Sequence, residues 1–204
     1  MTHRNLNFGV LLGSLRRRSF SRAIANTLDE LAPDDVCVSL LSSVGDLPSY
    51  NEDLQNTGIP NEVSLLARSI AESDAVVIVT PEYNHSIPGA LKNALDWLSR
   101  LPQHPFAGKP VAIQTVSPGL FGGVRAKPHL IQVMLSLDAS LLNKPAIEVA
   151  QVAHKVDGET AMLRDERTRT LIAEQLVALA KFAMKRSGRA ACHSRDRAEP
   201  PDAP

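Results

Sequence analysis

Short apolar runs and longer amphipathic stretches follow one another in regular alternation along most of the chain. The apolar runs are rich in β-branched side chains, which is typical of parallel strands buried on both faces. In the amphipathic stretches apolar residues recur every three or four positions, which indicates helices with one buried face. The pattern predicts strands over residues 8–13, 36–41, 75–79, 111–116 and 141–149, and helices near residues 23–31, 63–70, 88–98, 130–137 and 164–185.

Strands that alternate with helices in this way are typical of an α/β domain built on a doubly wound parallel sheet. The fingerprint G-x-G-x-x-G does not follow the first strand, so the chain lacks the signature of a Rossmann dinucleotide-binding domain. The other common strand order, 2-1-3-4-5, places a ligand beyond the carboxyl ends of strands 1 and 3. We therefore expect the loops that follow these two strands to form the site.

The composition is that of one ordinary globular domain followed by a polar tail. Hydrophobic residues make up 44% of the 204 residues and charged residues 22%, and the formal net charge is zero. This balance supports neither a nucleic-acid partner nor an acidic membrane surface. We expect residues 1–186 to form the domain, and residues 187–204, which lack large apolar side chains, to be disordered.

The cysteines and the apolar runs also bear on location. Cys37 lies in an apolar run, where it is expected in the core, and Cys192 lies in the tail, so we expect no disulfide framework. No apolar stretch is long enough to cross a bilayer, and the amino terminus lacks the apolar region of a signal peptide. We therefore expect a cytoplasmic protein without a membrane partner.

The loop after the first strand has the composition of a phosphate site. It offers the hydroxyl groups of Ser14, Ser19 and Ser21 and the guanidinium group of Arg16. The sequence leaves open whether Arg22 supplies a second guanidinium group. It also leads into the amino end of a helix, whose unpaired N–H groups attract anions. Three consecutive arginines alone would indicate a solvated patch, but their place between a buried strand and a helix favours phosphate binding. We expect the two arginines after Arg16 to point outward.

The loop after the third strand suits a flat, polar heterocycle. Backbone N–H and C=O groups from Glu82 to Asn84 can pair with a polar ring edge, and Tyr83 supplies an aromatic surface. Pro88 fits the first turn of the following helix, where a missing N–H costs nothing. Trp97, further along that helix, is expected to pack in the core rather than to contact a ligand.

The segment that contains this loop, residues 80–97, reads T-P-E-Y-N-H-S-I-P-G-A-L-K-N-A-L-D-W. It resembles the P-E-Y-N-x-S-x-P-G-x-L-K-N-x-x-D-W signature of the NADPH-dependent FMN reductases, which are related to bacterial chromate and quinone reductases and to azoreductases. The first loop resembles that family's G-S-L-R-x-x-S-x-N-R pattern, with Ser21 in place of the usual asparagine. The resemblance covers residues 8–149 and implies a flavodoxin-like fold, a doubly wound five-stranded parallel sheet in the order 2-1-3-4-5.

The same resemblance implies which residues hold an FMN cofactor. The first loop would bind the FMN phosphate, and the second would meet the flavin ring through its backbone rather than through the charge of Glu82. A third loop resembles the family's S-x-G-x-x-G-G-x-R segment, whose glycines let backbone amides approach the flavin. Arg125 is the last residue of this segment, and two residues later Lys127 stands where relatives commonly have Gln. The cofactor-binding residues predicted are Ser14, Arg16, Ser19, Ser21, Pro81, Glu82, Tyr83, Asn84, Ser117, Gly119 and Gly122.

The implied function is that of an FMN-dependent NAD(P)H oxidoreductase. Hydride would pass from NADPH or NADH to flavin N5 and on to a small-molecule acceptor: a quinone, an azo compound, a metal oxyanion or a free flavin. We expect no catalytic side chain, and the scattered histidines and cysteines favour no metal site. The alternative is a flavodoxin-type electron carrier or a flavin-binding regulatory module without NAD(P)H turnover. The sequence leaves open the acceptor and the choice between NADH and NADPH.

The helix expected near residues 130–137 carries more apolar surface than one sheet face needs. Its apolar side chains cover roughly 200° of the helix circumference, about twice the width of an ordinary buried stripe. The excess favours a second buried contact, most simply with another copy of the chain. We expect a homodimer or a homotetramer. The residues concerned are Leu130, Ile131, Val133, Met134, Leu135 and Leu137.

Overall fold

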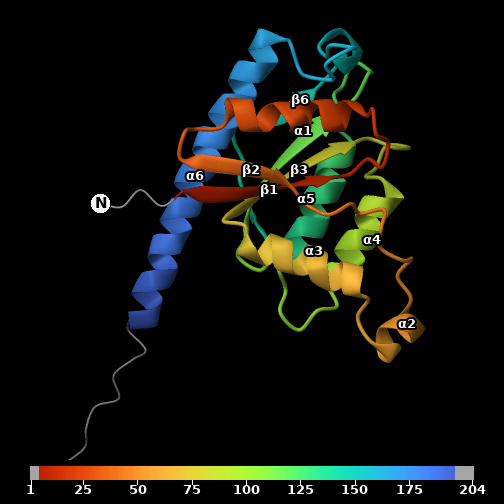
Figure 1. The fold of residues 1–204 in the computed structure, drawn as a ribbon, viewed down its shortest axis with the longest axis vertical. Coiled ribbons are helices and arrows are strands. Elements are labelled where there is room, and N and C mark those ends of the chain that lie inside the picture. The colour runs from red at the N-terminus through yellow and green to blue at the C-terminus, as the bar shows by residue number, and fades with distance from the viewer. Residues whose placement is uncertain (1–4, 196–204) are drawn as a thin grey trace, which may run out of the picture.

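A computed structural model describes the backbone of residues 5–195 and the side chains of residues 5–186. In these residues one parallel sheet has the strand order β2-β1-β3-β4-β5, and β6 pairs with β4 as well. Figure 1 shows the sheet between two layers of helices. The predicted order 2-1-3-4-5 and the flavodoxin-like fold are confirmed. The strands are β1 (Leu6–Leu12), β2 (Val36–Leu40), β3 (Ala75–Pro81), β4 (Pro110–Val116), β5 (Ser140–Leu141) and β6 (Ile147–Val149).

The fifth strand position is filled by two short strands rather than by the one continuous strand expected over residues 141–149. Both pair with β4, at Val111↔Leu141 and at Gln114↔Ile147. The chain leaves the sheet between them, at a proline that has no N–H for the ladder. Gln175 spans this gap, because it donates to the Pro145 carbonyl (2.7 Å) and accepts from Gln114 (2.9 Å). The break is therefore bridged by buried side-chain amides.

Two helical layers cover the two faces of the sheet, and alternate residues of β3 pack against one layer or the other. Val77 and Val79 pack in a core with α1 and α6, whereas Val76 and Ile78 pack in a second core with α3, α4 and α5. Successive strand residues point to opposite faces, so an unbroken apolar run serves both cores. The helices are α1 (Phe20–Leu31), α2 (Glu52–Thr57), α3 (Asn61–Glu72), α4 (Gly89–Leu98), α5 (Ala126–Ser136) and α6 (Glu166–Arg195), with a 3-10 turn η1 (Val152–His154).

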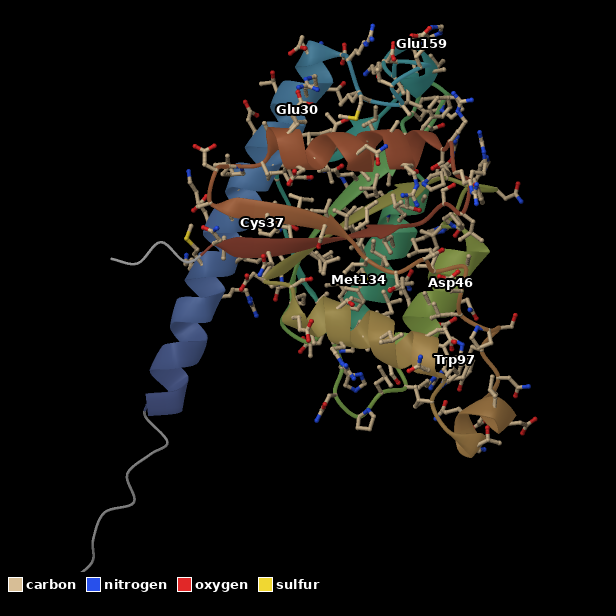
Figure 2. The ribbon with its side chains drawn as sticks, in the orientation of Figure 1. Glu30, Cys37, Asp46, Trp97, Met134 and Glu159 are labelled. Atoms are coloured by element: carbon tan, nitrogen blue, oxygen red, sulfur yellow. The ribbon has the colours of Figure 1, made fainter. Side chains whose placement is uncertain are left out.

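Some local expectations need correction. Cys37 is exposed on β2 at the sheet edge, as Figure 2 shows, and is not a core residue. The long loop after β2 contains the short helix α2, and α6 extends past its expected end near residue 185. Of residues 187–204, for which disorder was predicted, residues 187–195 continue α6, and residues 196–204 lie outside the described residues. Among the residues described, no helix is both long and apolar enough to span a membrane.

Trp97 packs in the core, as predicted, and also holds the long loop after β2. Its side chain is fully buried, and its Nε1 donates to the Pro48 carbonyl at 2.8 Å. Asn93, one turn earlier on α4, donates to the same carbonyl at 2.9 Å and accepts from the Tyr50 N–H at 2.7 Å. These two α4 side chains, four residues apart, thus anchor this loop against the helix. Figure 2 shows Trp97 on α4, close to the segment that carries α2.

Helix α5 buries most of its wide apolar arc within the chain itself. Leu130, Met134 and Leu137 are buried, and Ile131 and Val133 pack against the same core. Leu135 is the member of the arc that stays largely exposed, at 61%. The width of the arc is therefore explained mainly by neighbouring elements of this chain, and it is weaker support for an oligomer than the sequence suggested.

Candidate functional site

Three loops emerge from the carboxyl ends of β1, β3 and β4, which are neighbours in the sheet. The first loop is residues 13–19, the second residues 82–88 and the third residues 117–125. Gly13 begins the first loop, and its N–H donates to the Val79 carbonyl of β3 at 2.9 Å. A Cβ atom at Gly13 would lie 2.3 Å from Thr80 Oγ1, so only glycine lets the first loop pass β3 this closely. The first and second loops thus leave the sheet from the carboxyl ends of adjacent strands, β1 and β3.

The first loop and the start of α1 hold buried donors that lack a protein acceptor. Ser14 and Ser21 are 5% and 1% exposed, and neither hydroxyl has a hydrogen-bond partner. Arg22 Nε is likewise buried without a partner. Ser19 is the N-cap of α1 and accepts from the Arg22 N–H at 3.1 Å. Buried polar groups are almost always paired, so donors gathered at a helix amino terminus indicate a site for an anion.

The exposed arginines of this loop differ in their contacts. Arg16 and Arg17 are both exposed. Arg18 donates from Nη2 to the Gly158 carbonyl at 3.2 Å, so it links the first loop to the segment before α6. The first turn of α1 contains no acidic residue that would pair with these arginines in place of a phosphate. The arrangement suits a phosphate held by serine hydroxyls, helix N–H groups and one or two guanidinium groups.

The second loop begins with a tight turn. The N–H and C=O groups of Tyr83 and Ser86 exchange hydrogen bonds of 2.9 and 3.0 Å, with Asn84 and His85 between them. Both central residues have left-handed backbones, with φ of 48° and 65°, the geometry of a type I′ turn. Asparagine tolerates this conformation better than most residues, which explains Asn84 without any ligand. Tyr83 is 46% exposed at the same turn and leaves an aromatic face accessible.

Glu82 uses its side chain in a way that the sequence did not predict. Its Oε2 accepts from the N–H groups of Arg125 (2.9 Å) and Ala126 (3.1 Å), and its Oε1 lies 3.8 Å from Arg125 Nη1. The carboxylate therefore binds the start of α5, in addition to any role of its backbone. Only the fold brings these residues together, since they are separated by more than forty positions in the sequence.

Two glycines of the third loop are required by close packing. Gly122 has φ of 61°, and a Cβ there would lie 2.7 Å from the Glu148 carbonyl carbon. Gly123 has φ of 85°, and its Cβ would lie 2.9 Å from Thr115 Cβ. Gly119 has no such constraint, because its nearest neighbour, Ser117 Oγ, would stand at 3.4 Å. Ser117 Oγ instead accepts from the Gly119 N–H at 3.1 Å, which shapes the start of the loop.

Two further residues lie near the third loop. Thr115 was not predicted from the sequence, and Lys127 is the residue that stands where relatives commonly have Gln. Thr115, at the end of β4, is fully buried and its hydroxyl has no partner. Its position at a strand end was the only available signal. Lys127 forms an ion pair with Glu148 of β6 inside the chain. The guanidinium of Arg125 lies over the Phe121 ring, 5.4 Å from its centroid, as well as near Glu82.

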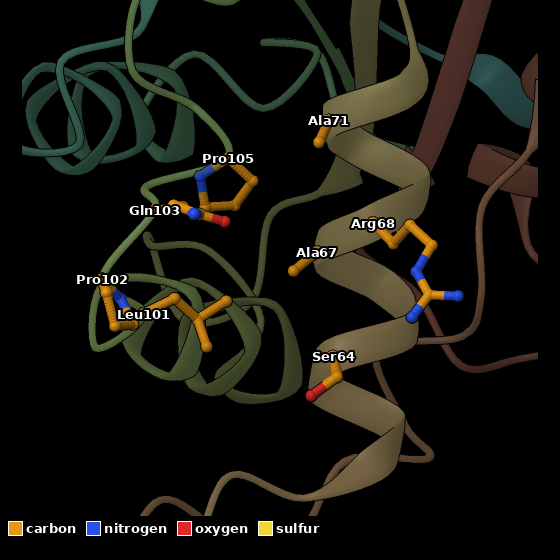
Figure 3. A pocket seen from close by; sticks show the side chains of 8 residues that line it. All are labelled: Ser64, Ala67, Arg68, Ala71, Leu101, Pro102, Gln103 and Pro105. Carbon is orange, nitrogen blue, oxygen red and sulfur yellow. The ribbon is translucent and has the colours of Figure 1, made fainter.

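The remaining features of the described residues do not add to this site. No group of three or more histidine, cysteine or acidic side chains among them is arranged to hold a metal ion. A pocket of about 460 Å³ lies between α3 and the segment after α4 (Figure 3). It is lined by residues of α3 and by Leu101, Pro102, Gln103 and Pro105, which precede β4 rather than follow a strand. This pocket is thus separate from the three loops.

The chain is similar to known proteins over most of its length. The model of one protein family, NADPH-dependent FMN reductase, matches residues 6–154. A quinone reductase of Escherichia coli strain K12 is 48% identical over 177 residues, which are 86% of this chain and 94% of that protein. A 2-hydroxy-1,4-benzoquinone reductase of a Burkholderia species is 38% identical, over 81% of this chain and 90% of that protein. The solved structure of FerB, a flavoenzyme NAD(P)H:(acceptor) oxidoreductase from Paracoccus denitrificans, superposes with a TM-score of 0.79 at 33% identity, covering 89% and 98% of the two chains.

Proposed function

The chain belongs to the family of NADPH-dependent FMN reductases, and on that premise we propose that it transfers reducing equivalents from NAD(P)H to a quinone. Membership makes it an oxidoreductase with FMN as cofactor and NAD(P)H as co-substrate. The quinone acceptor is supported by relatives named quinone reductase and 2-hydroxy-1,4-benzoquinone reductase. Azo compounds, metal oxyanions and free flavins are acceptors that the motifs alone do not distinguish from quinones.

The observation that supports the FMN cofactor in this proposal is the set of unpaired buried donors in the first loop and the first turn of α1. Ser14, Ser21 and Arg22 each bury a polar atom without a partner there, and an FMN phosphate would supply the acceptors. Ser19 and Arg16 complete the proposed phosphate site. Within the described residues, no protein group pairs with these three atoms. The residues present therefore fit the cofactor that the family requires.

The other two loops would hold the ring. The backbone from Pro81 to Asn84 would pair with the polar edge of the flavin, and Tyr83 would offer an aromatic surface beside it. Ser117, Gly119 and Gly122 would bring backbone amides of the third loop to the ring. When bound, FMN supplies the hydride chemistry itself. The protein contributes position and electrostatics, and we assign no general acid or base.

Anaerobic reduction tests the function. We expect the purified full chain to carry yellow flavin that NADPH or NADH bleaches, and a quinone added afterwards to restore the colour. The comparison of the two nicotinamides also measures the preference between them. An electron carrier or a regulatory module would keep its colour in the presence of either nicotinamide, and this result would refute the enzyme proposal.

We also propose that the chain assembles as a homodimer or a homotetramer. The third loop supports this, because Leu120, Phe121 and Val124 are exposed to 71%, 63% and 47%. Exposed apolar side chains in such number beside a site are typical of an interface. Light scattering at micromolar concentration should give the mass of two or four subunits, and Phe121→Ser should lower it. Leu54→Ser, which changes an exposed leucine of α2, is the matched control. A monomeric parent protein with full activity would contradict this proposal.

The limits of the domain and its location are proposals too. We place the FMN-binding domain in residues 1–186 and treat residues 187–204 as a tail without a part in flavin binding. The family match, over residues 6–154, lies wholly within the proposed domain. A cytoplasmic location is favoured because NADPH and NADH are supplied there.

A further inference from the structure

Helix α5 begins without a capping side chain of its own. Arg125 occupies the N-cap position, its backbone is already helical (φ −82°, ψ −35°), and it makes no side-chain capping hydrogen bond. The first turn of α5 also contains no acidic residue. Because the first N–H groups of a helix have no partner within the helix and carry a positive partial charge, they need an acceptor from elsewhere.

Glu82 of the second loop supplies that acceptor. Its carboxylate accepts from two consecutive N–H groups of α5 and pairs with the Arg125 guanidinium. The Glu82 side chain is only 15% exposed, so solvent screens these contacts less than it would at the surface. Hydrogen bonds from N–H groups to a carboxylate are stronger than those between neutral groups. The cap therefore joins two of the three loops of the site.

A second contact joins the same two segments one helical turn further on. Ser86 Oγ lies 2.9 Å from His129 Nδ1 of α5. Ser86 follows Glu82 by four residues and His129 follows Arg125 by four, so the contacts are in register. Two contacts in register restrict rotation as well as separation, which a single contact would not do.

We propose that Glu82 is a positioning residue, whose carboxylate fixes the third loop and the start of α5 against the second loop in the arrangement that binds FMN. This inference rests on the proposed function. Gly122 and Gly123 lie just before the capped N–H groups, so loss of the cap removes one restraint on the segment that carries their amides. The side chain, and not only the backbone, of Glu82 thus serves the cofactor site.

The test uses Glu82→Gln in the full chain, which keeps the shape of the side chain and removes its charge. Removing the charge weakens both hydrogen bonds to the α5 N–H groups and removes the ion pair with Arg125, so the dissociation constant for FMN should rise up to about tenfold. The visible circular dichroism of bound FMN should change with it. Hydrogen exchange should accelerate at the amides of residues 117–129, with or without flavin. Ser86→Ala, which removes the second contact, should give the same changes with smaller size.

Asp165→Asn is the matched control. Asp165 caps α6 by accepting from the Thr168 N–H at 3.0 Å, away from the three loops. This variant should lose comparable thermal stability but keep the FMN affinity and the dichroism of the parent. The inference is overturned if Glu82→Gln matches the parent in affinity, dichroism and exchange, or if Asp165→Asn changes FMN binding equally. A parent protein that binds no FMN would refute the proposed function, and hydrogen exchange would still decide whether Glu82 fixes the third loop.

Discussion

Replacing Arg16 by alanine is expected to weaken FMN binding by about tenfold to a hundredfold while leaving the fold intact. Arg16 is exposed beside the unpaired donors of Ser14 and Ser21, at the amino end of α1. Hydrogen bonds to charged groups contribute roughly 1.5–3 kcal/mol, and each 1.4 kcal/mol is about tenfold in affinity. Because the side chain is exposed, its loss leaves no cavity. The measurement is the FMN dissociation constant by fluorescence titration, with thermal unfolding as the check on the fold.

Arg17→Ala is the control for this prediction. Arg17 is the adjacent residue, is also exposed, and loses the same charge on substitution. If Arg16 contacts the phosphate and Arg17 points outward, the control should stay within about twofold of the parent, as surface substitutions usually do. Equal losses in the two variants would mean that general positive charge, and not a contact of Arg16, attracts the cofactor. An unchanged Arg16 variant would remove this residue from the phosphate site.

Replacing Gly13 by alanine should impair both the stability and the flavin binding of the protein. The added methyl group would stand 2.3 Å from Thr80 Oγ1, 2.7 Å from its Cβ and 3.1 Å from its Cα. The backbone contact prevents relief by a rotamer change alone, so the first loop must move away from β3. Overpacking of this kind costs about 1–3 kcal/mol. Urea unfolding of the full chain measures the loss, and FMN titration shows whether the displaced loop still binds the phosphate.

The same substitution at Gly89 separates steric crowding from the general effect of adding a methyl group. Gly89 is the first residue of α4, and a Cβ there meets nothing within 4 Å. Gly89→Ala should leave FMN binding unchanged and should not destabilise the protein, since alanine favours a helix over glycine by up to about 1 kcal/mol. A Gly13 variant as stable as the Gly89 variant would show that the contact with Thr80 relaxes freely.

Local pattern alone determined most of the framework. The apolar run at residues 75–79 marked β3 because a strand between two helical layers needs apolar side chains on both faces. Helical spacing from Leu91 to Leu98 placed α4, and the polar loops after β1 and β3 marked the site. These features depend on residues close together in sequence, which the linear pattern records. The motif in residues 80–97 then identified the family.

Only the tertiary structure decided which side chains distant in sequence contact one another. Glu82 caps α5, Trp97 binds the Pro48 carbonyl, and Lys127 pairs with Glu148. The burial of a side chain also depends on residues that are distant in the sequence. Thr115 and Ser21 bury unpaired hydroxyls, whereas Cys37 is exposed although it lies in an apolar run. A hydrogen bond between residues forty positions apart leaves no periodic trace, because its energy depends on distance in space, and the packing of the whole sheet sets that distance.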